Sequence, residues 1–184
     1  MSEDDARHTP DPSHAQEHDG LDEMIDTLRE LVTLERERLN VAPRLAEVAL
    51  PDALLRLADA LGDAERYEEA LAVGDEAVAR WTALREDPGE RGPQFASRCA
   101  RRLAEALYLQ SYYLDELGRY EAAREAAERE LALRHELARA GADDGRYDLA
   151  AAYNNLSNAL QGLERDADEL AARREALALR RALA

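Results

Sequence analysis

The stretch "ELGRYEAAR", Glu116 to Arg124, separates two runs of residues that favour helices. Glycine ends helices readily because it adopts the left-handed backbone conformation without steric cost, so Gly118 marks a turn. Two related breaks, "ALGDAERYEEAL" around Tyr67 and "GLERDADEL" around Asp166, lie 53 residues before and 46 residues after Tyr120. A helix–turn–helix unit repeated in tandem predicts stacked hairpins, since one hairpin alone cannot bury its apolar face.

The spacing of apolar residues predicts a helix on each side of every break. The expected helices are 52–63, 65–86, 94–117, 119–140, 146–162 and 165–183. The stretches "DPGERGP" and "AGADDG" are loops by composition and separate one hairpin from the next. The resulting helical repeats cover about 51–92, 93–144 and 145–184.

The segment before the repeats divides into two parts. Residues 1–20 predict a disordered acidic tail, because they contain almost no large apolar side chains. Residues 21–50 predict extra N-terminal helices, with apolar side chains at helical spacing from Leu21 onward. Proline disfavours a helix interior, so we expect a short helical turn after Asn40 and a fresh start near Pro51.

Composition excludes several classes of function. The 184 residues include 40 acids and 24 bases, giving a formal net charge of −16, and every base is arginine. Such a surface repels phosphate backbones, so nucleic acid is not an expected partner. No apolar run reaches the roughly 18 residues of a membrane span, and no signal peptide opens the chain. The single cysteine, Cys99, fits a reducing compartment, and we expect a cytoplasmic protein.

Catalytic motifs are also missing from the sequence. It contains no glycine-rich phosphate loop, no GxSxG, no HExxH and no paired-cysteine metal site. We therefore expect no enzyme activity, no cofactor and no bound metal.

The chain resembles the tetratricopeptide repeat family. In "LGRYEAA", Gly118, Tyr120 and Ala123 match the turn glycine, the aromatic residue and the small residue of that pattern. The other breaks depart from it, with Glu65 at the first glycine position and Glu164 at the last. The stretch "LAAAYNNLSNAL" looks like the longer-period repeats of kinesin light chains and bacterial regulators. The resemblance covers roughly 50–184 and implies an all-α fold of antiparallel hairpins stacked as a right-handed superhelix.

We call the helix that opens each hairpin its first helix. The first helices of the second and third hairpins carry a polar face opposite their apolar face. In "YNNLSNALQ", Asn154, Asn158 and Gln161 lie opposite the leucines, with Asn155 and Ser157 on the flanks. The corresponding face of the middle helix carries Arg101, Glu105, Tyr108, Tyr112 and Asp115. In the first repeat this face carries Asp52, Leu55 and Asp59. Gln110 lies within the apolar stripe of the middle helix and therefore needs a hydrogen-bond partner.

The resemblance implies that these faces line a concave groove. Amides there would bond the backbone of an extended peptide, and tyrosines would add rigid contact area. The chain has no lysine and the acids Glu105 and Asp115 flank the face, so a neutral or basic protein segment is the expected partner rather than a terminal carboxylate. The alternative, that the face is simply solvated or that the tyrosines pack under the next repeat, stays open.

A second hypothesis concerns the end of the stack. Stacked repeats need a covered end, and "LALRRALA" provides no polar capping helix. Leu177, Leu179 and Leu183 are therefore candidates for self-association as a homodimer with a structural or regulatory role. A peptide- or metabolite-responsive regulator is a third hypothesis.

Overall fold

A computed structural model describes residues 12–141 and 145–182, and within these ranges the chain is helical and contains no strand. The helices, in chain order, are α1 (Pro12–Val41), α2 (Pro43–Asp63), α3 (Tyr67–Glu86), α4 (Gly92–Glu116), α5 (Tyr120–Arg139), α6 (Arg146–Gly162) and α7 (Asp166–Arg181). Each helix packs on the next as an antiparallel neighbour, which forms the hairpins α2/α3, α4/α5 and α6/α7. The predicted all-α stack of hairpins is confirmed.

The N-terminal third differs from the prediction in two places. The predicted tail covered residues 1–20, but α1 begins at Pro12, and residues 1–11 lie outside the described part of the chain. The predicted break near Pro51 is wrong, because α2 runs through this residue. A proline in a helix interior costs about 3 kcal/mol. The Pro51 ring is fully buried, and this burial offsets part of that cost.

The three breaks found in the sequence adopt one and the same turn. At the second break, the Gly118 amide donates to the Asp115 carbonyl and the Arg119 amide donates to the Leu114 carbonyl. These two bonds define a Schellman cap, which requires a left-handed residue. Gly118 has φ 68°, and Glu65 and Glu164 occupy the equivalent positions with φ 56° each. The register of the repeats is therefore the one that the sequence predicts, even where glutamate replaces glycine.

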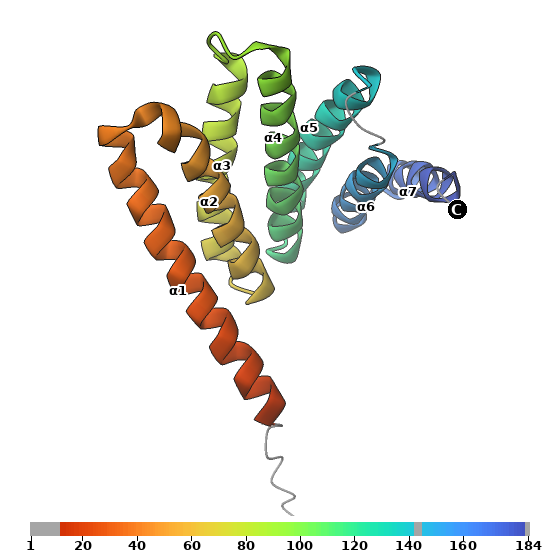
Figure 1. The fold of residues 1–184 in the computed structure, drawn as a ribbon. Helices are drawn as coiled ribbons and strands as arrows, with labels where there is room; N and C mark the ends of the chain where they lie inside the picture. Colours follow the sequence, from red (N-terminus) through yellow and green to blue (C-terminus); the bar gives the residue numbers. More distant parts are fainter. Residues whose placement is uncertain (1–11, 142–144, 183–184) are drawn as a thin grey trace, which may run out of the picture.

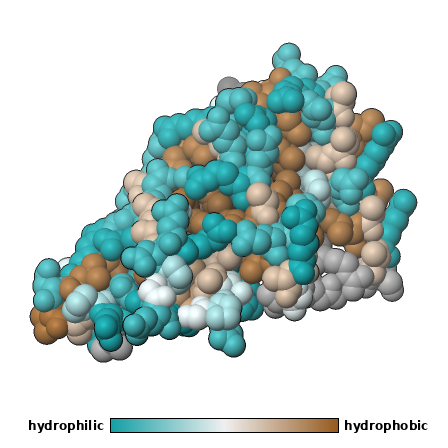
Figure 2. Space-filling model, turned by 90° about the horizontal axis from the view of Figure 1, so that it is seen from above, coloured by the Kyte–Doolittle hydropathy of each residue, from teal (hydrophilic) through white to brown (hydrophobic). Residues whose placement is uncertain are grey.

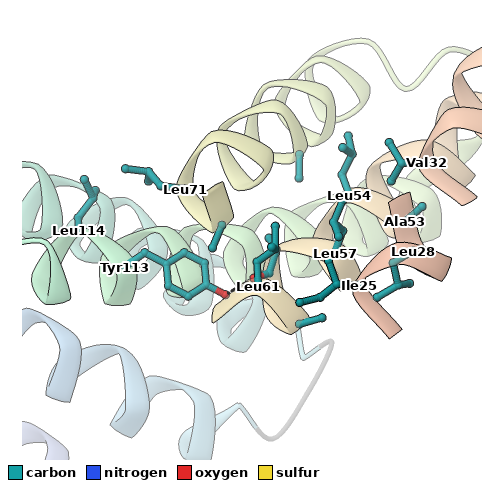
Figure 3. Packing of buried hydrophobic residues seen from close by; sticks show 14 of the residues in the cluster. Ile25, Leu28, Val32, Ala53, Leu54, Leu57, Leu61, Leu71, Tyr113 and Leu114 are labelled. Atoms are coloured by element: carbon teal, nitrogen blue, oxygen red, sulfur yellow. Dashed lines mark hydrogen bonds between the residues drawn. The ribbon is translucent and has the colours of Figure 1, made fainter. Parts of the chain in front are cut away.

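The largest core joins the first two hairpins to α1. Ile25, Leu28 and Val32 of α1 pack against leucines of α2 (Figure 3). On the other side of α2, α4 contributes the fully buried Tyr113. The Tyr113 side chain points toward the C-terminal end of α2, as Figure 3 shows. A Cβ on Gly62 would lie 2.5 Å from the Tyr113 ring, so only glycine permits this approach of α4 to α2.

Two layers run along the stack (Figure 1). The first helices form one layer, in which α2 packs on α4 and α4 packs on α6. Ion pairs bridge the other layer: Arg29 of α1 pairs with Glu69 of α3 at 2.9 Å, and Arg85 of α3 pairs with Glu136 of α5 at 2.7 Å. Seen from above, hydrophilic residues cover most of the surface, and hydrophobic residues gather between hydrophilic ridges (Figure 2).

Candidate functional site

The exposed sides of α2, α4 and α6, here called the first-helix face, contain most of the residues proposed from the sequence. On α4, Arg101, Glu105 and Tyr112 are exposed, whereas Tyr108 and Asp115 are half-buried. Gln110 instead turns toward α3, where its amide donates to the Asp75 carboxylate at 2.6 Å. The polar residue in the apolar stripe therefore has the hydrogen-bond partner that it needs.

A cavity of about 380 Å³ lies between α2 and α4 on the first-helix face. We call it the tyrosine pocket, because four tyrosines line it together with Gly62, Leu109 and three acids. The tyrosines are Tyr67, Tyr108, Tyr112 and Tyr113. The acids are Asp59, Asp63 and Glu65. The lining therefore contains no basic residue.

Three of the tyrosine rings form a tight group in this pocket. The Tyr112 ring lies 6.0 Å from that of Tyr67, edge to face, and 5.7 Å from that of Tyr113. Such contacts hold aromatic rings in fixed orientations. The Tyr113 hydroxyl donates to the Ala58 carbonyl of α2 at 2.8 Å, which fixes one wall of the pocket. Tyr112 remains 37% exposed, so solvent reaches the ring group from the first-helix face.

Ionisation in the pocket reflects its excess of acids. Partial burial raises the pKa of Asp59, and the nearby carboxylates of Asp63 and Glu105 raise it further. The pKa of the Tyr112 hydroxyl is also raised, first by its interaction with the Tyr67 hydroxyl and then by burial. Burial is the main cause of the raised pKa of Tyr108. Negative charge is therefore unfavourable in this pocket, because no cation balances it.

A second cavity, of about 220 Å³, continues along the same groove between α2 and α4. It shares Asp59, Tyr108 and Leu109 with the tyrosine pocket and adds Leu55, Arg56, Arg102 and Glu105. Arg102 pairs with Glu105 and with Asp52 of α2, both at 2.7 Å. The arginine predicted at this face was Arg101, which lines neither cavity. Arg102 reaches Glu105 because it lies three residues before it on α4, and its ion pair with Asp52 links α4 to α2.

Asparagines on α6 divide into two groups. Asn154 and Asn158 have no hydrogen-bond partner among the described residues, and Asn158 is exposed. Asn155 faces α4, where its amide donates to the Tyr108 carbonyl at 3.3 Å. The sequence placed Asn155 on a flank of the polar face, and in the structure it links two hairpins.

The two other polar residues proposed on α6, Ser157 and Gln161, contact α7. Arg173 of α7 donates to the buried Ser157 hydroxyl at 3.0 Å and to the Gln161 side-chain oxygen at 3.1 Å. No α6 residue lines either cavity between α2 and α4. The structure therefore places the tyrosines and the asparagines on neighbouring parts of one face and not in one cavity.

Asp115 completes the α4 residues proposed from the sequence. One of its carboxylate oxygens is buried and has no hydrogen-bond partner among the described residues. Burial is the main cause of its raised pKa, and the neighbouring Glu116 adds to the effect.

Two of the three candidate residues for self-association, Leu177 and Leu179, lie on α7. Leu177 is 47% exposed, and Leu170 on the same helix is 48% exposed. Leu179 differs from the prediction, because it packs against the small core formed by Leu131 and Leu149. Leu183 lies outside the described residues.

Within 12–141 and 145–182, no three His, Cys, Asp or Glu side chains are grouped as metal ligands. No helix in the described ranges is both long and apolar enough to cross a membrane.

Comparison with known proteins identifies the fold. No protein-family model matches the sequence. No curated protein matches it either. The structure is similar to the crystal structure of BtubC (BKLC) from P. vanneervenii, with a TM-score of 0.58 and 21% identity over 86% of this chain and 56% of the BtubC chain. The present chain thus spans little more than half the length of this neighbour.

A second similar structure is a MamA double mutant (MamA RS-1 ArsTM). Its TM-score is 0.47 and its identity 21%, over 84% of this chain and 75% of the MamA chain. With the turns described above, the likeness to BtubC shows a tetratricopeptide-like helical repeat fold.

Proposed function

We propose that this chain is a non-catalytic protein-interaction module that binds an extended protein segment along the first-helix face. The observation that carries the proposal is the tyrosine pocket, where exposed aromatic surface meets carboxylates without a cation partner. Large, rigid aromatic side chains with a polar tip dominate many protein interfaces. Tyr112 has this character, with its ring held by Tyr67 and Tyr113 and one side open.

The α6 part of the face supports an extended segment. Asn154 and Asn158 have unused donors and acceptors, which match the alternating groups of a peptide backbone. The net charge of −16 favours a neutral or basic segment, because it attracts cations and repels anions. A reducing compartment such as the cytoplasm suits the buried, free thiol of Cys99.

A panning experiment with random peptides tests this proposal. A display library of short peptides is selected on the full chain, and the affinity of the selected peptides is measured by fluorescence anisotropy. We expect Tyr108→Ala/Asn158→Ala to weaken binding at least tenfold, whereas Leu177→Asp, on the far end of the stack, leaves it unchanged. Selection of no peptide, or equal affinity for wild type and the double variant, would reject the first-helix face as the binding surface.

Self-association through α7 is the second candidate function, favoured by the exposed leucines Leu170 and Leu177. Large apolar side chains exposed on one helix are typical of contact surfaces. Sedimentation of the wild type and of Leu177→Asp distinguishes the two functions. A dimer that the substitution dissociates supports self-association, and a monomer at all concentrations rejects it.

A further inference from the structure

Acidic side chains line the tyrosine pocket without any basic side chain, whereas the adjoining cavity contains both kinds. The lining of the adjoining cavity contains two arginines, Arg56 and Arg102, and two acids, and Arg102 pairs there with Glu105. In the tyrosine pocket, Asp59 and Asp63 have no ion-pair partner among the described residues. Their positions on α2 are four residues apart, so both carboxylates lie on one side of the helix. Together with Glu65 they give the lining three formal negative charges and no positive charge.

Aromatic rings supply the rest of the pocket wall. Tyr108 and Tyr112 are one helical turn apart on α4, and the Tyr67 ring lies at right angles to that of Tyr112. The face of an aromatic ring attracts a cation within about 6 Å, and a guanidinium group also stacks on it. Acids and tyrosines therefore favour the same kind of ligand here, an organic cation with some apolar length.

The ionisation of Asp59 also favours a cation as the ligand. Its pKa is raised by burial and by the carboxylates of Asp63 and Glu105, which a bound cation would oppose. A bare metal ion fits less well, because no three metal-ligating side chains are grouped within the described residues.

We infer that the tyrosine pocket receives an arginine side chain of the protein segment that lies along the first-helix face. This inference rests on the proposed function and names the residue that anchors the segment. A planar guanidinium group stacks on tyrosine and offers forked donors to Asp59 and Asp63, whereas the compact lysine ammonium is more strongly hydrated. The volume of about 380 Å³ accommodates the guanidinium group and its propyl stem.

Two peptides that differ in one group test the inference. The probes are a capped peptide of alanine, serine and glycine with one central arginine, and the same peptide with citrulline, which keeps the shape and removes the charge. Binding to the full chain is followed by NMR, with the ring signals of Tyr67, Tyr108 and Tyr112 as the readout. We expect the arginine peptide to shift these signals and to bind about tenfold or more tightly than the citrulline peptide.

Substitution of the two free acids completes the test. Asp59→Asn/Asp63→Asn should reduce the affinity for the arginine peptide to that for the citrulline peptide. The control Glu30→Gln/Glu37→Gln makes the same change in net charge at two exposed positions of α1 and should leave the affinity unchanged. Equal effects of both double variants would overturn the inference, because the peptide would then respond to overall charge alone.

The remaining outcomes separate this inference from the proposed function. If panned peptides require Tyr108 and Asn158 but tolerate citrulline in place of arginine, the arginine pocket is wrong and the binding face stands. If capped arginine alone binds as tightly as the peptide, the pocket holds a free small cation and not a protein segment, which also overturns the inference. If no peptide binds at all, both proposals fail.

Discussion

Two junctions join the three hairpins, and they share one contact but differ in what else they bury. Between α2 and α4 the buried Tyr113 ring is seated on Gly62. Between the second and third hairpins the Tyr120 ring of α5 lies against Gly162 of α6, where a Cβ would be 2.3 Å from the ring. This second junction also contains a polar link between first helices. The Asn155 amide of α6 donates to the Tyr108 carbonyl of α4 at 3.3 Å.

A buried carboxylate adds to the polar character of the second junction. Glu130 of α5 is completely buried, and one of its oxygens lies 3.3 Å from Arg134, which also pairs with Asp148 of α6 at 2.7 Å. Its other oxygen has no hydrogen-bond partner among the described residues. Both junctions therefore depend on shape, and the second also contains a buried carboxyl group. We expect only the second to respond strongly to pH.

Replacement of the Glu130 carboxyl group should produce the largest effect. Burial raises the pKa of Glu130 to about 8, against an ordinary value of 4.5, although Arg134 opposes the shift. Between these values the folded chain keeps a proton that the unfolded chain has lost. The resulting stabilisation is complete below pH 4.5 and is lost as pH rises through 8, at up to about 1.4 kcal/mol per pH unit.

Urea unfolding at several pH values checks this prediction. The free energy of unfolding of the wild type, minus that of Glu130→Gln, should fall as pH increases from 5 to 8. Other carboxylates cancel in the difference, because both proteins contain them. A difference that stays constant with pH would show that Glu130 ionises normally in the folded chain.

The shape of the first junction should be tested by Gly62→Ala. The added methyl group would lie 2.5 Å from the ring of the fully buried Tyr113. Overpacking of this kind costs about 1–3 kcal/mol. Gly74→Ala is the matched control, because it also lies inside a helix and its new Cβ would make an ordinary 3.9 Å contact with Ala58. Alanine there should stabilise the chain by up to about 1 kcal/mol. Denaturation midpoints that shift in the same direction would contradict the prediction.

The turns within the hairpins should give smaller effects on stability. All three turns adopt the same backbone conformation, with a left-handed residue at the equivalent position. Glu164 has φ 56°, a conformation that costs an L-residue about 1–2 kcal/mol and glycine nothing. Glu164→Gly should therefore raise the free energy of unfolding by about 1 kcal/mol. Gly118→Ala should lower it by a similar amount, since a Cβ there meets nothing within 4 Å and only the backbone strain counts. Thermal unfolding measures both, and a Glu164→Gly variant no more stable than wild type would be the contrary result.

Much of the fold was predictable because it depends on local rules. The turn at Gly118 follows from its residue type, and the apolar spacing fixes the register of the equivalent Glu65 and Glu164. Passage of α2 through Pro51 was not predictable, since it depends on tertiary burial of the ring. Helical periodicity likewise places Tyr112 and Tyr113 on adjacent sides of α4. It does not indicate that Tyr113 inserts into α2.

The candidate site was predictable only in part. Glu105, Tyr108 and Tyr112 follow from the face of a single helix. Asp63 and Tyr67 line the tyrosine pocket from the end of α2 and the start of α3, and their proximity to Tyr112 appears only when two hairpins are stacked.

The smallest effects on stability are expected for the asparagines of α6. They distinguish an asparagine that links two hairpins from one that is free on the first-helix face. Asn155→Ala removes the amide that donates to the Tyr108 carbonyl, and such a bond contributes about 0.5–1.5 kcal/mol. Alanine favours the helix by roughly 0.5 kcal/mol more than asparagine does, and this gain offsets part of the loss. The net loss of stability should therefore be small but measurable. Asn158→Ala removes no described bond and should be neutral or slightly stabilising in chemical denaturation. If Asn158→Ala instead destabilised the chain as much as Asn155→Ala, this asparagine would belong to the structure of the junction and would not be free to bind a segment.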